Sequence, residues 1–119
     1  MKRRFPAINT KTVRTKRTKY KAIKTEIDGI TFHSKLESEY YSYLKLRKAI
    51  GEISYFLLQV PIHIGGGVKY IADFLVVYPS GEMEYVDVKG VLTKMYKTKK
   101  KIVESLYPFK IKEVYKGDF

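Results

Sequence analysis

Cysteine is absent from the 119-residue chain, so neither a disulfide framework nor a thiolate metal site is available to it. This composition fits a reducing cytosol. No apolar run approaches the length of a membrane span, and the N-terminus lacks the apolar region of a signal peptide. We therefore expect a soluble cytoplasmic protein with one globular domain and no membrane contact.

Several catalytic and cofactor signatures are also missing. The chain has no Ser/His/Asp arrangement, no internal repeat and no nucleotide-binding glycine fingerprint, so we expect no small-molecule organic cofactor. Residues 65–67 are three consecutive glycines, which we interpret as a turn because no helix follows them. His33 and His63 lack metal-ligand spacing and are interpreted as ordinary polar residues.

Acidic residues are absent from positions 1–25, which contain ten basic ones, whereas the whole chain has 24 basic and 12 acidic residues. We interpret residues 1–20 as a flexible basic arm on a domain that comprises residues 21–119. The arm favours nucleic acid as partner over an anionic membrane, because it lacks an apolar face; a solubilising tail is the remaining alternative. The arm's candidate phosphate-binding residues are Arg3, Arg4, Lys11, Arg14, Lys16, Arg17 and Lys19.

Residues 70–90 form the most informative stretch, Y-I-A-D-F-L-V-V-Y-P-S-G-E-M-E-Y-V-D-V-K-G. The apolar run bounded by turn residues predicts a buried strand, and residues 79–81, Pro-Ser-Gly, predict a three-residue hairpin loop after it. With symmetric flanks on this loop, Asp73 lies directly opposite Asp87. Lys89 comes two residues later and therefore shares the face that carries both carboxylates.

This register opposes two like charges and also sets Ile71 opposite Lys89. Opposed side chains have Cβ atoms about 5 Å apart, and at an effective dielectric constant of about 20 their repulsion is roughly 3 kcal/mol. A divalent cation shared by Asp73 and Asp87 would remove this cost, since Mg²⁺ prefers one or two carboxylates, water and substrate phosphate. Lys89 would then orient water or stabilise negative charge. The spacing leaves one alternative open, a shifted register in which Asp87 and Lys89 form a solvated surface pair.

The segment before this hairpin predicts a second, smaller hairpin and a helix. Residues 22–32 alternate around Asp28-Gly29, a strong two-residue turn signal. Residues 34–37, Ser-Lys-Leu-Glu, have the form of a capping box and open a helix that ends near Ile50, before a glycine. Glu37 lies at the margin of the helix's apolar stripe, where it either faces the sheet or only caps the helix. Glu39 lies at the opposite margin, so the helical wheel does not choose between the two acids.

Two further strands complete the expected sheet. Residues 53–64 are strand-like, and Pro61 within them indicates an edge strand or a bulge. Residues 111–115 form a last strand after a helix, and a crossover of this kind implies parallel pairing at one edge of the sheet.

Residues 93–107 predict the second helix, with Thr93 as its N-cap. Lys99 lies within the apolar stripe, where it either extends past its neighbours or points toward the carboxylates. The residues expected to be buried are Met95, Ile102, Val103 and Leu106. The lysines Lys97, Lys100 and Lys101 are candidates for contact with a nucleic-acid backbone, the alternative being a solvated lysine face.

The order helix, three antiparallel strands, helix, strand, with these acids in place, resembles the PD-(D/E)XK nuclease superfamily. More closely, the chain resembles a family of small phage proteins within it. The resemblance is carried by D-G-I-T-F-H-S-K-L-E at residues 28–37, Y-I-A-D-F at 70–74 and V-D-V-K-G at 86–90, and it covers about residues 20–115. It implies an α/β (α+β) fold with a restriction-endonuclease-like αβββαβ core and a mixed central sheet. The sequence departs from the pattern at Ala72, which replaces the Pro, and at Asp87, where Glu is commoner.

The resemblance implies a metal-dependent DNA endonuclease. Asp73 and Asp87 would bind Mg²⁺ or Mn²⁺, Glu37 would complete the metal shell, and Lys89 would assist the attacking water. Analogy with small junction-cutting nucleases suggests selectivity for branched DNA, such as a Holliday junction, and a homodimer. Two alternatives stay open. One is a nucleic-acid-binding module without catalysis, and the other is an accessory subunit of a phage replication or packaging complex.

Overall fold

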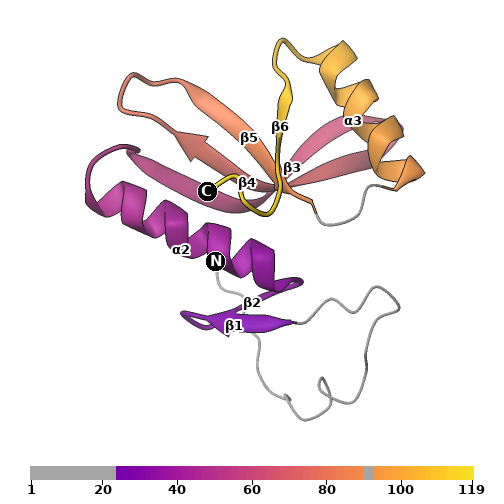
Figure 1. The fold of residues 1–119 in the computed structure, drawn as a ribbon. Helices are drawn as coiled ribbons and strands as arrows, with labels where there is room; N and C mark the ends of the chain where they lie inside the picture. The colour runs from indigo at the N-terminus through magenta and orange to yellow at the C-terminus, as the bar shows by residue number, and fades with distance from the viewer. Residues whose placement is uncertain (1–23, 90–92) are drawn as a thin grey trace. The chain divides into compact units, whose positions relative to one another are not determined.

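The structure, a computed structural model, describes residues 24–89 and 93–119 (Figure 1). The predicted basic arm therefore lies outside the described residues. The elements in chain order are β1 (Thr25–Ile27), β2 (Ile30–Phe32), α2 (Lys35–Ala49), β3 (Tyr55–Gly65), β4 (Val68–Val77), β5 (Met83–Val88), α3 (Lys94–Leu106) and β6 (Ile111–Val114). The chain divides into two compact units, Met1–Ser42 and Tyr43–Phe119, with the division inside α2.

The described part of the first unit contains the predicted small hairpin. Strands β1 and β2 pair antiparallel, and Asp28 (φ 55°) and Gly29 (φ 78°) form their turn. Both turn residues have the positive φ that the Asp-Gly signal predicts. The Tyr41 hydroxyl donates to Asp28 Oδ2 at 2.8 Å, and the Tyr41 ring lies 5.0 Å from that of Phe32. The turn is therefore tied to the first half of α2.

Helix α2 begins and ends with the caps that the sequence predicts. The Glu37 N–H donates to Ser34 Oγ at 3.1 Å, and Gly51 (φ 84°) follows the last turn. Glu37 is buried, 6% exposed, whereas Glu39 is exposed, a distinction that the helical wheel did not provide. Ile50 is 62% exposed, because the helix ends at Ala49 and this residue is no longer on its apolar stripe.

The second unit is built on a four-stranded sheet in the order β3-β4-β5-β6. Strands β3, β4 and β5 pair antiparallel in sequence, and β6 pairs parallel to β5 after the α3 crossover, as Figure 1 shows. The mixed sheet confirms the predicted α/β class and strand order. It also confirms that β3, which contains Pro61, is an edge strand. No helix within the described ranges is long and apolar enough to cross a membrane.

Helix α3 packs on one face of this sheet through a different stripe from the predicted one. Its start is as expected, since Thr93 Oγ1 accepts from the Tyr96 N–H at 3.1 Å. Val103 is fully buried, in a cluster with Ile62, Tyr70, Ala72 and Ile111, and Tyr96 packs against it. The other residues expected to be buried are exposed: Met95 (68%), Leu106 (56%) and Ile102 (37%). The stripe that contains Tyr96 and Val103 therefore faces the sheet. The neighbouring aliphatic stripe, which consists of Met95, Ile102 and Leu106, does not.

Candidate functional site

The β4–β5 hairpin has the predicted loop and register. The Tyr78 N–H donates to the Glu82 carbonyl at 2.9 Å across residues 79–81, and Gly81 has φ 96°. Paired positions run from Val77 with Met83 to Phe74 with Val86. The shifted register that would leave Asp87 in a surface pair is thereby excluded, since Asp87 is only 1% exposed.

Backbone pairing between β4 and β5 ends at Phe74 and Val86, one residue before Asp73 and Asp87. At these two residues, hydrogen bonds between side chain and backbone connect the strands instead. The Asp73 N–H donates to Asp87 Oδ1 at 2.9 Å, and the Val88 N–H donates to Asp73 Oδ2 at 3.0 Å. Each carboxylate thus accepts a bond from the backbone of the other strand. The predicted pairing of Ile71 with Lys89 is wrong, because the two strands separate here and Ile71 is exposed. This reciprocal arrangement fixes both carboxylates between the diverging strands.

One carboxylate oxygen of Asp87 is buried and accepts no hydrogen bond from the described protein atoms. Its Oδ2 is buried without a hydrogen-bond partner in the described part of the chain, and so is the Tyr70 hydroxyl. Burial raises the pKa of the Asp87 carboxyl, although the Asp73 N–H and the Lys89 charge act in the opposite direction. Glu113, beside Asp87 on β6, also raises this pKa. An unsatisfied buried carboxylate oxygen is costly, and a bound cation would compensate it.

Lys89 is held beside Asp87 by an aromatic ring from α3. Its Nζ lies 3.8 Å from the centroid of the Tyr96 ring, a close cation–π contact. The Tyr96 hydroxyl donates to Glu113 Oε2 at 2.9 Å, and the Tyr115 hydroxyl donates to Glu113 Oε1 at 2.8 Å. Each oxygen of Glu113 therefore accepts one tyrosine hydroxyl, and the bond to Tyr96 orients this ring.

One depression of about 340 Å³ contains Asp73, Asp87, Lys89 and Tyr96. Its lining residues are Lys69, Tyr70, Ile71, Asp73, Asp87, Lys89, Thr93, Met95, Tyr96 and Lys99. Lys99, for which the sequence leaves two orientations open, belongs to this lining. Two carboxylates and three lysines share the depression, a composition suited to a cation together with an anionic ligand.

Residues 17–116 match the family described as "Protein of unknown function (DUF1064)". The chain belongs to this family. No curated protein matches the sequence.

Glu37 of this DUF1064 chain belongs to the first unit, whereas Asp73 and Asp87 belong to the second. Its part in a shared metal site therefore stays a prediction. Within the described ranges, no group of three or more His, Cys, Asp and Glu side chains could hold a metal ion. The acidic part of the site consists of the two aspartates.

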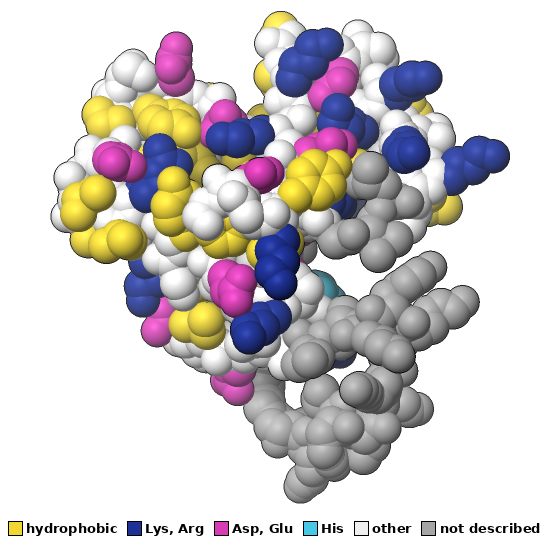
Figure 2. All heavy atoms as spheres, in the orientation of Figure 1, with side chains coloured by type: hydrophobic (Ala, Val, Ile, Leu, Met, Phe, Trp, Pro, Cys, Tyr) yellow, Lys and Arg dark blue, Asp and Glu magenta, His cyan; other side chains and the backbone are white. Residues whose placement is uncertain are grey.

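The candidate nucleic-acid residues of α3 have different surroundings. Lys97 and Lys101 are exposed, whereas the Lys100 Nζ forms an ion pair with Glu104 Oε2 at 3.0 Å. Figure 2 shows Lys and Arg side chains gathered over the part of the molecule that contains α3. The seven candidates of the N-terminal arm lie outside the described residues.

Sequence reasoning did not identify Tyr70, Tyr96 and Glu113 as parts of the site. The parallel pairing of β6 was predicted, but not the register that sets Glu113 beside Asp87. Gln59 could point at the site, but the sequence favours an ordinary strand amide. It has φ 51°, an uncommon value for a residue other than glycine, and it lies between the paired positions Leu58–Phe74 and Val60–Ala72, at the level of Asp73. Strained backbone next to a polar site is a common sign of function.

Proposed function

We propose that this protein is a metal-dependent endonuclease that hydrolyses DNA phosphodiester bonds. The observation that carries the proposal is the pair of aspartates, which exchange backbone hydrogen bonds where β4 and β5 separate. The pair is accompanied by an adjacent lysine and by a buried Asp87 oxygen that has no hydrogen-bond partner in the described part of the chain. Two carboxylates, a lysine and a buried oxygen of this kind in one depression are typical of a functional site.

The residues present fit a divalent cation. Asp73 and Asp87 would hold it, and two carboxylates with water and phosphate are a common Mg²⁺ environment. When bound, the ion would polarise the phosphate and lower the pKa of bound water. Mg²⁺ and Mn²⁺ are the metals that the proposal names.

The chain's own residues bind and orient the phosphodiester. Lys89, fixed over the Tyr96 ring, would stabilise the negative charge that develops on the phosphate as water attacks the phosphorus. The attacking water loses a proton to solvent as its oxygen bonds to phosphorus, the P–O bond to the leaving sugar oxygen breaks, and that oxygen takes a proton from solvent. Lys69 and Lys99 in the same depression would bind neighbouring phosphate oxygens.

The finer parts of the proposal rest on the sequence motifs and on the lysines of the depression. The PD-(D/E)XK motifs at Asp73, Asp87 and Lys89 support membership of that superfamily, with Glu37 as a third acid. Contacts from Lys69 and Lys99 to phosphate oxygens would carry no sequence information, which favours recognition of DNA shape. Branched DNA as substrate and a homodimer are the corresponding proposals.

The test is a panel of labelled linear, nicked, flap and four-way DNA substrates incubated with Mg²⁺ or Mn²⁺. We expect cleavage that EDTA stops and that Asp73→Asn or Lys89→Ala abolishes. Asp118→Asn and Lys112→Ala are matched controls on exposed residues outside the depression and should cleave normally. Wild-type protein inert on every substrate with both metals would contradict the proposal.

A second candidate is a nucleic-acid-binding protein without catalysis, as a free module or a phage accessory subunit. It is favoured by the net charge of +12 and by the lack of a third metal-ligating side chain in the described part of the site. It predicts DNA binding that Asp73→Asn leaves intact and no cleavage by either protein.

A further inference from the structure

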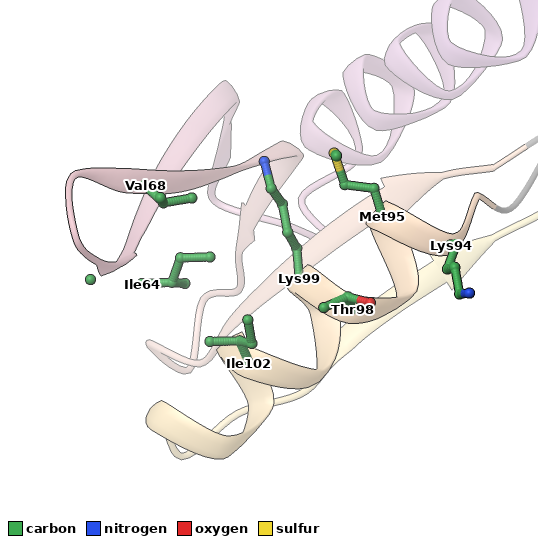
Figure 3. A pocket seen from close by; sticks show the side chains of 8 residues that line it. Ile64, Val68, Lys94, Met95, Thr98, Lys99 and Ile102 are labelled. Atoms are coloured by element: carbon green, nitrogen blue, oxygen red, sulfur yellow. The ribbon is translucent and has the colours of Figure 1, made fainter.

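The exposed aliphatic stripe of α3 forms one wall of a second depression. Met95 and Ile102 from this stripe face Ile64 and Val68, which flank the β3–β4 turn, as Figure 3 shows. Val68 is 44% exposed and Met95 68% exposed. We call this depression of about 610 Å³ the aliphatic groove; its remaining lining residues are Gly65, Lys94, Thr98 and Lys99.

The aliphatic groove is continuous with the depression of about 340 Å³ that contains Asp73 and Asp87, which we call the carboxylate depression. Met95 and Lys99 line both, and Lys69 of the carboxylate depression follows Val68 of the groove directly in sequence. In Figure 3 the Lys99 side chain rises from α3 between Val68 and Met95. A ligand that enters the groove therefore passes Lys99 on its way to Asp73 and Asp87.

The charges at the groove limit what it can hold. Among the described residues its walls are aliphatic, no acid lines it, and its charged lining residues are Lys94 and Lys99. In Figure 3 Lys99 rises beside the groove, whereas the Lys94 side chain points away from Ile64 and Val68. An apolar ligand alone would gain nothing from the Lys99 charge, and a bare phosphate would gain nothing from the aliphatic walls. A nucleotide has both parts, an apolar base face and an adjacent phosphate, and enzymes that hold an unstacked base place it between aromatic or apolar side chains.

We propose that the aliphatic groove binds an unpaired nucleobase next to the phosphate that the lysines of the carboxylate depression would bind. The proposal rests on the nuclease function and names its substrate class, DNA with an unpaired nucleotide beside the scissile bond, as in a flap, bulge or gap. A stacked and paired base cannot enter such a groove without leaving the duplex, which costs free energy. An already unpaired base avoids that cost.

The first test uses full-length protein in EDTA and an oligonucleotide with 2-aminopurine at an unpaired position. Neighbouring bases quench this fluorophore, whereas aliphatic walls do not, so binding should increase its fluorescence. Replacing the unpaired nucleotide by an abasic one should weaken binding about tenfold, because the apolar area that the base buries against the groove is lost. Equal affinity for the abasic and the complete strand would overturn the proposal.

Two variants on the same helix provide a matched comparison. Ile102→Glu introduces a negative charge into the groove, whereas Leu106→Glu introduces the same charge on α3 outside its lining. We expect Ile102→Glu to abolish the fluorescence increase and to weaken binding of the unpaired strand about tenfold more than Leu106→Glu does. Equal effects of the two variants would overturn the proposal that the groove binds an unpaired base.

The outcomes separate this proposal from the nuclease function. Loss of selectivity for unpaired DNA in Ile102→Glu, with cleavage of a nicked duplex intact, supports both. If cleavage depends on metal but Ile102→Glu and Leu106→Glu are equally selective for unpaired DNA, only the proposal that the groove binds a base is overturned. A fluorescence increase in a protein that cleaves nothing supports the groove while the nuclease function fails. A wild-type dimer that only Ile102→Glu dissociates would overturn the groove in favour of a second copy of this chain.

Discussion

Asp87 is a charged residue that folding removes almost completely from water, and its substitution should separate stability from function. Asp87→Asn keeps an oxygen to accept from the Asp73 N–H but removes the buried charge. Without metal we expect the variant to be more stable than wild type by about 1 kcal/mol, or roughly 4 °C in Tm. Thermal unfolding in EDTA measures this difference.

The same variant should lose the response to metal. Mn²⁺ or Mg²⁺ should raise the Tm of wild type, because binding to the folded state alone stabilises it. Asp87→Asn should show no such increase and no cleavage, whereas Asp118→Asn should behave as wild type. An unchanged metal response in Asp87→Asn would mean that the ion, if it binds, does so elsewhere.

Tyr96 is a positioning residue for Lys89, and two substitutions distinguish its ring from its hydroxyl. Tyr96→Phe keeps the ring below the Lys89 Nζ but loses the bond to Glu113, whereas Tyr96→Leu loses both. We expect Tyr96→Phe to cleave at close to the wild-type rate and Tyr96→Leu to cleave about tenfold more slowly. The measurement is kcat on nicked DNA, together with the Mn²⁺ shift in Tm.

The Mn²⁺ shift should be the same in both Tyr96 variants, because neither changes the aspartates. If Tyr96→Phe were as slow as Tyr96→Leu, the hydroxyl and Glu113 would matter more than the cation–π contact. If both variants lost the metal response, Tyr96 would have a structural role in the aspartate pair.

At the residue scale, the sequence predicts contacts set by local rules. Asp73, Asp87 and Lys89 come together because a tight turn fixes the register of the hairpin that carries them. Tyr96 and Glu113 come from elements whose register depends on how α3 packs, which no local pattern encodes. The exchange of hydrogen bonds between the aspartates was likewise unpredictable, since it requires the strands to separate at that point.

At the scale of elements, Glu104 links the end of α3 to the start of β6. Its Oε2 accepts from the Ile111 N–H at 2.8 Å and from Lys100 at 3.0 Å. Burial raises the pKa of this carboxyl, but the two bonds outweigh it and the net direction is downward. The ionised form is therefore stabilised in the folded protein, and this contribution is present at neutral pH and lost as the pH falls through the folded pKa.

Glu104→Gln should lower the free energy of unfolding at pH 7 by about 1 kcal/mol, because a charge-assisted bond becomes a neutral one. The difference from wild type should shrink as the pH falls below the ordinary glutamate pKa of about 4.3 and disappear below the lowered pKa of the folded state, where the wild-type glutamate is protonated too. Urea denaturation at several pH values measures it. Glu52→Gln, which affects the more exposed ion pair with Arg47, is the control and should change stability by less than about 0.5 kcal/mol. If the difference in free energy of unfolding between Glu104→Gln and wild type does not depend on pH, the charge of Glu104 does not contribute to stability.

Helix α3 also shows why existence and end points of an element are easier to predict than its orientation. Thr93 and Pro108 mark its limits, and both signals are local. Its buried face is not, because Met95, Ile102 and Leu106 on one stripe and Tyr96 and Val103 on the next have equally good helical spacing. The sheet selects the second stripe, since Val103 is fully buried in one cluster with Tyr70 and Ile111. The unused stripe is the one that borders the aliphatic groove.

At the scale of the whole molecule, the positive charge is concentrated in a segment of sequence apart from the candidate site. Residues 1–19 carry eight of the 24 basic residues and no acidic one. If they bind phosphates, each contact releases counterions from DNA, and log Kd depends on log salt with a slope of about 0.9 per contact. The arm would then add affinity without taking part in the chemistry at Asp73 and Asp87.

Deletion of residues 1–19 should therefore weaken DNA binding and reduce its salt slope by several units, while cleavage at saturating protein keeps its rate. Titrations of a fluorescent four-way DNA at several salt concentrations measure the slope. A full-length variant with Gln at all eight basic positions of the arm is the control for chain length and should behave like the deletion. Equal salt slopes for the deletion and the wild type would mean that the arm makes no phosphate contacts, and the lysines of α3 would then be the main candidates for DNA binding.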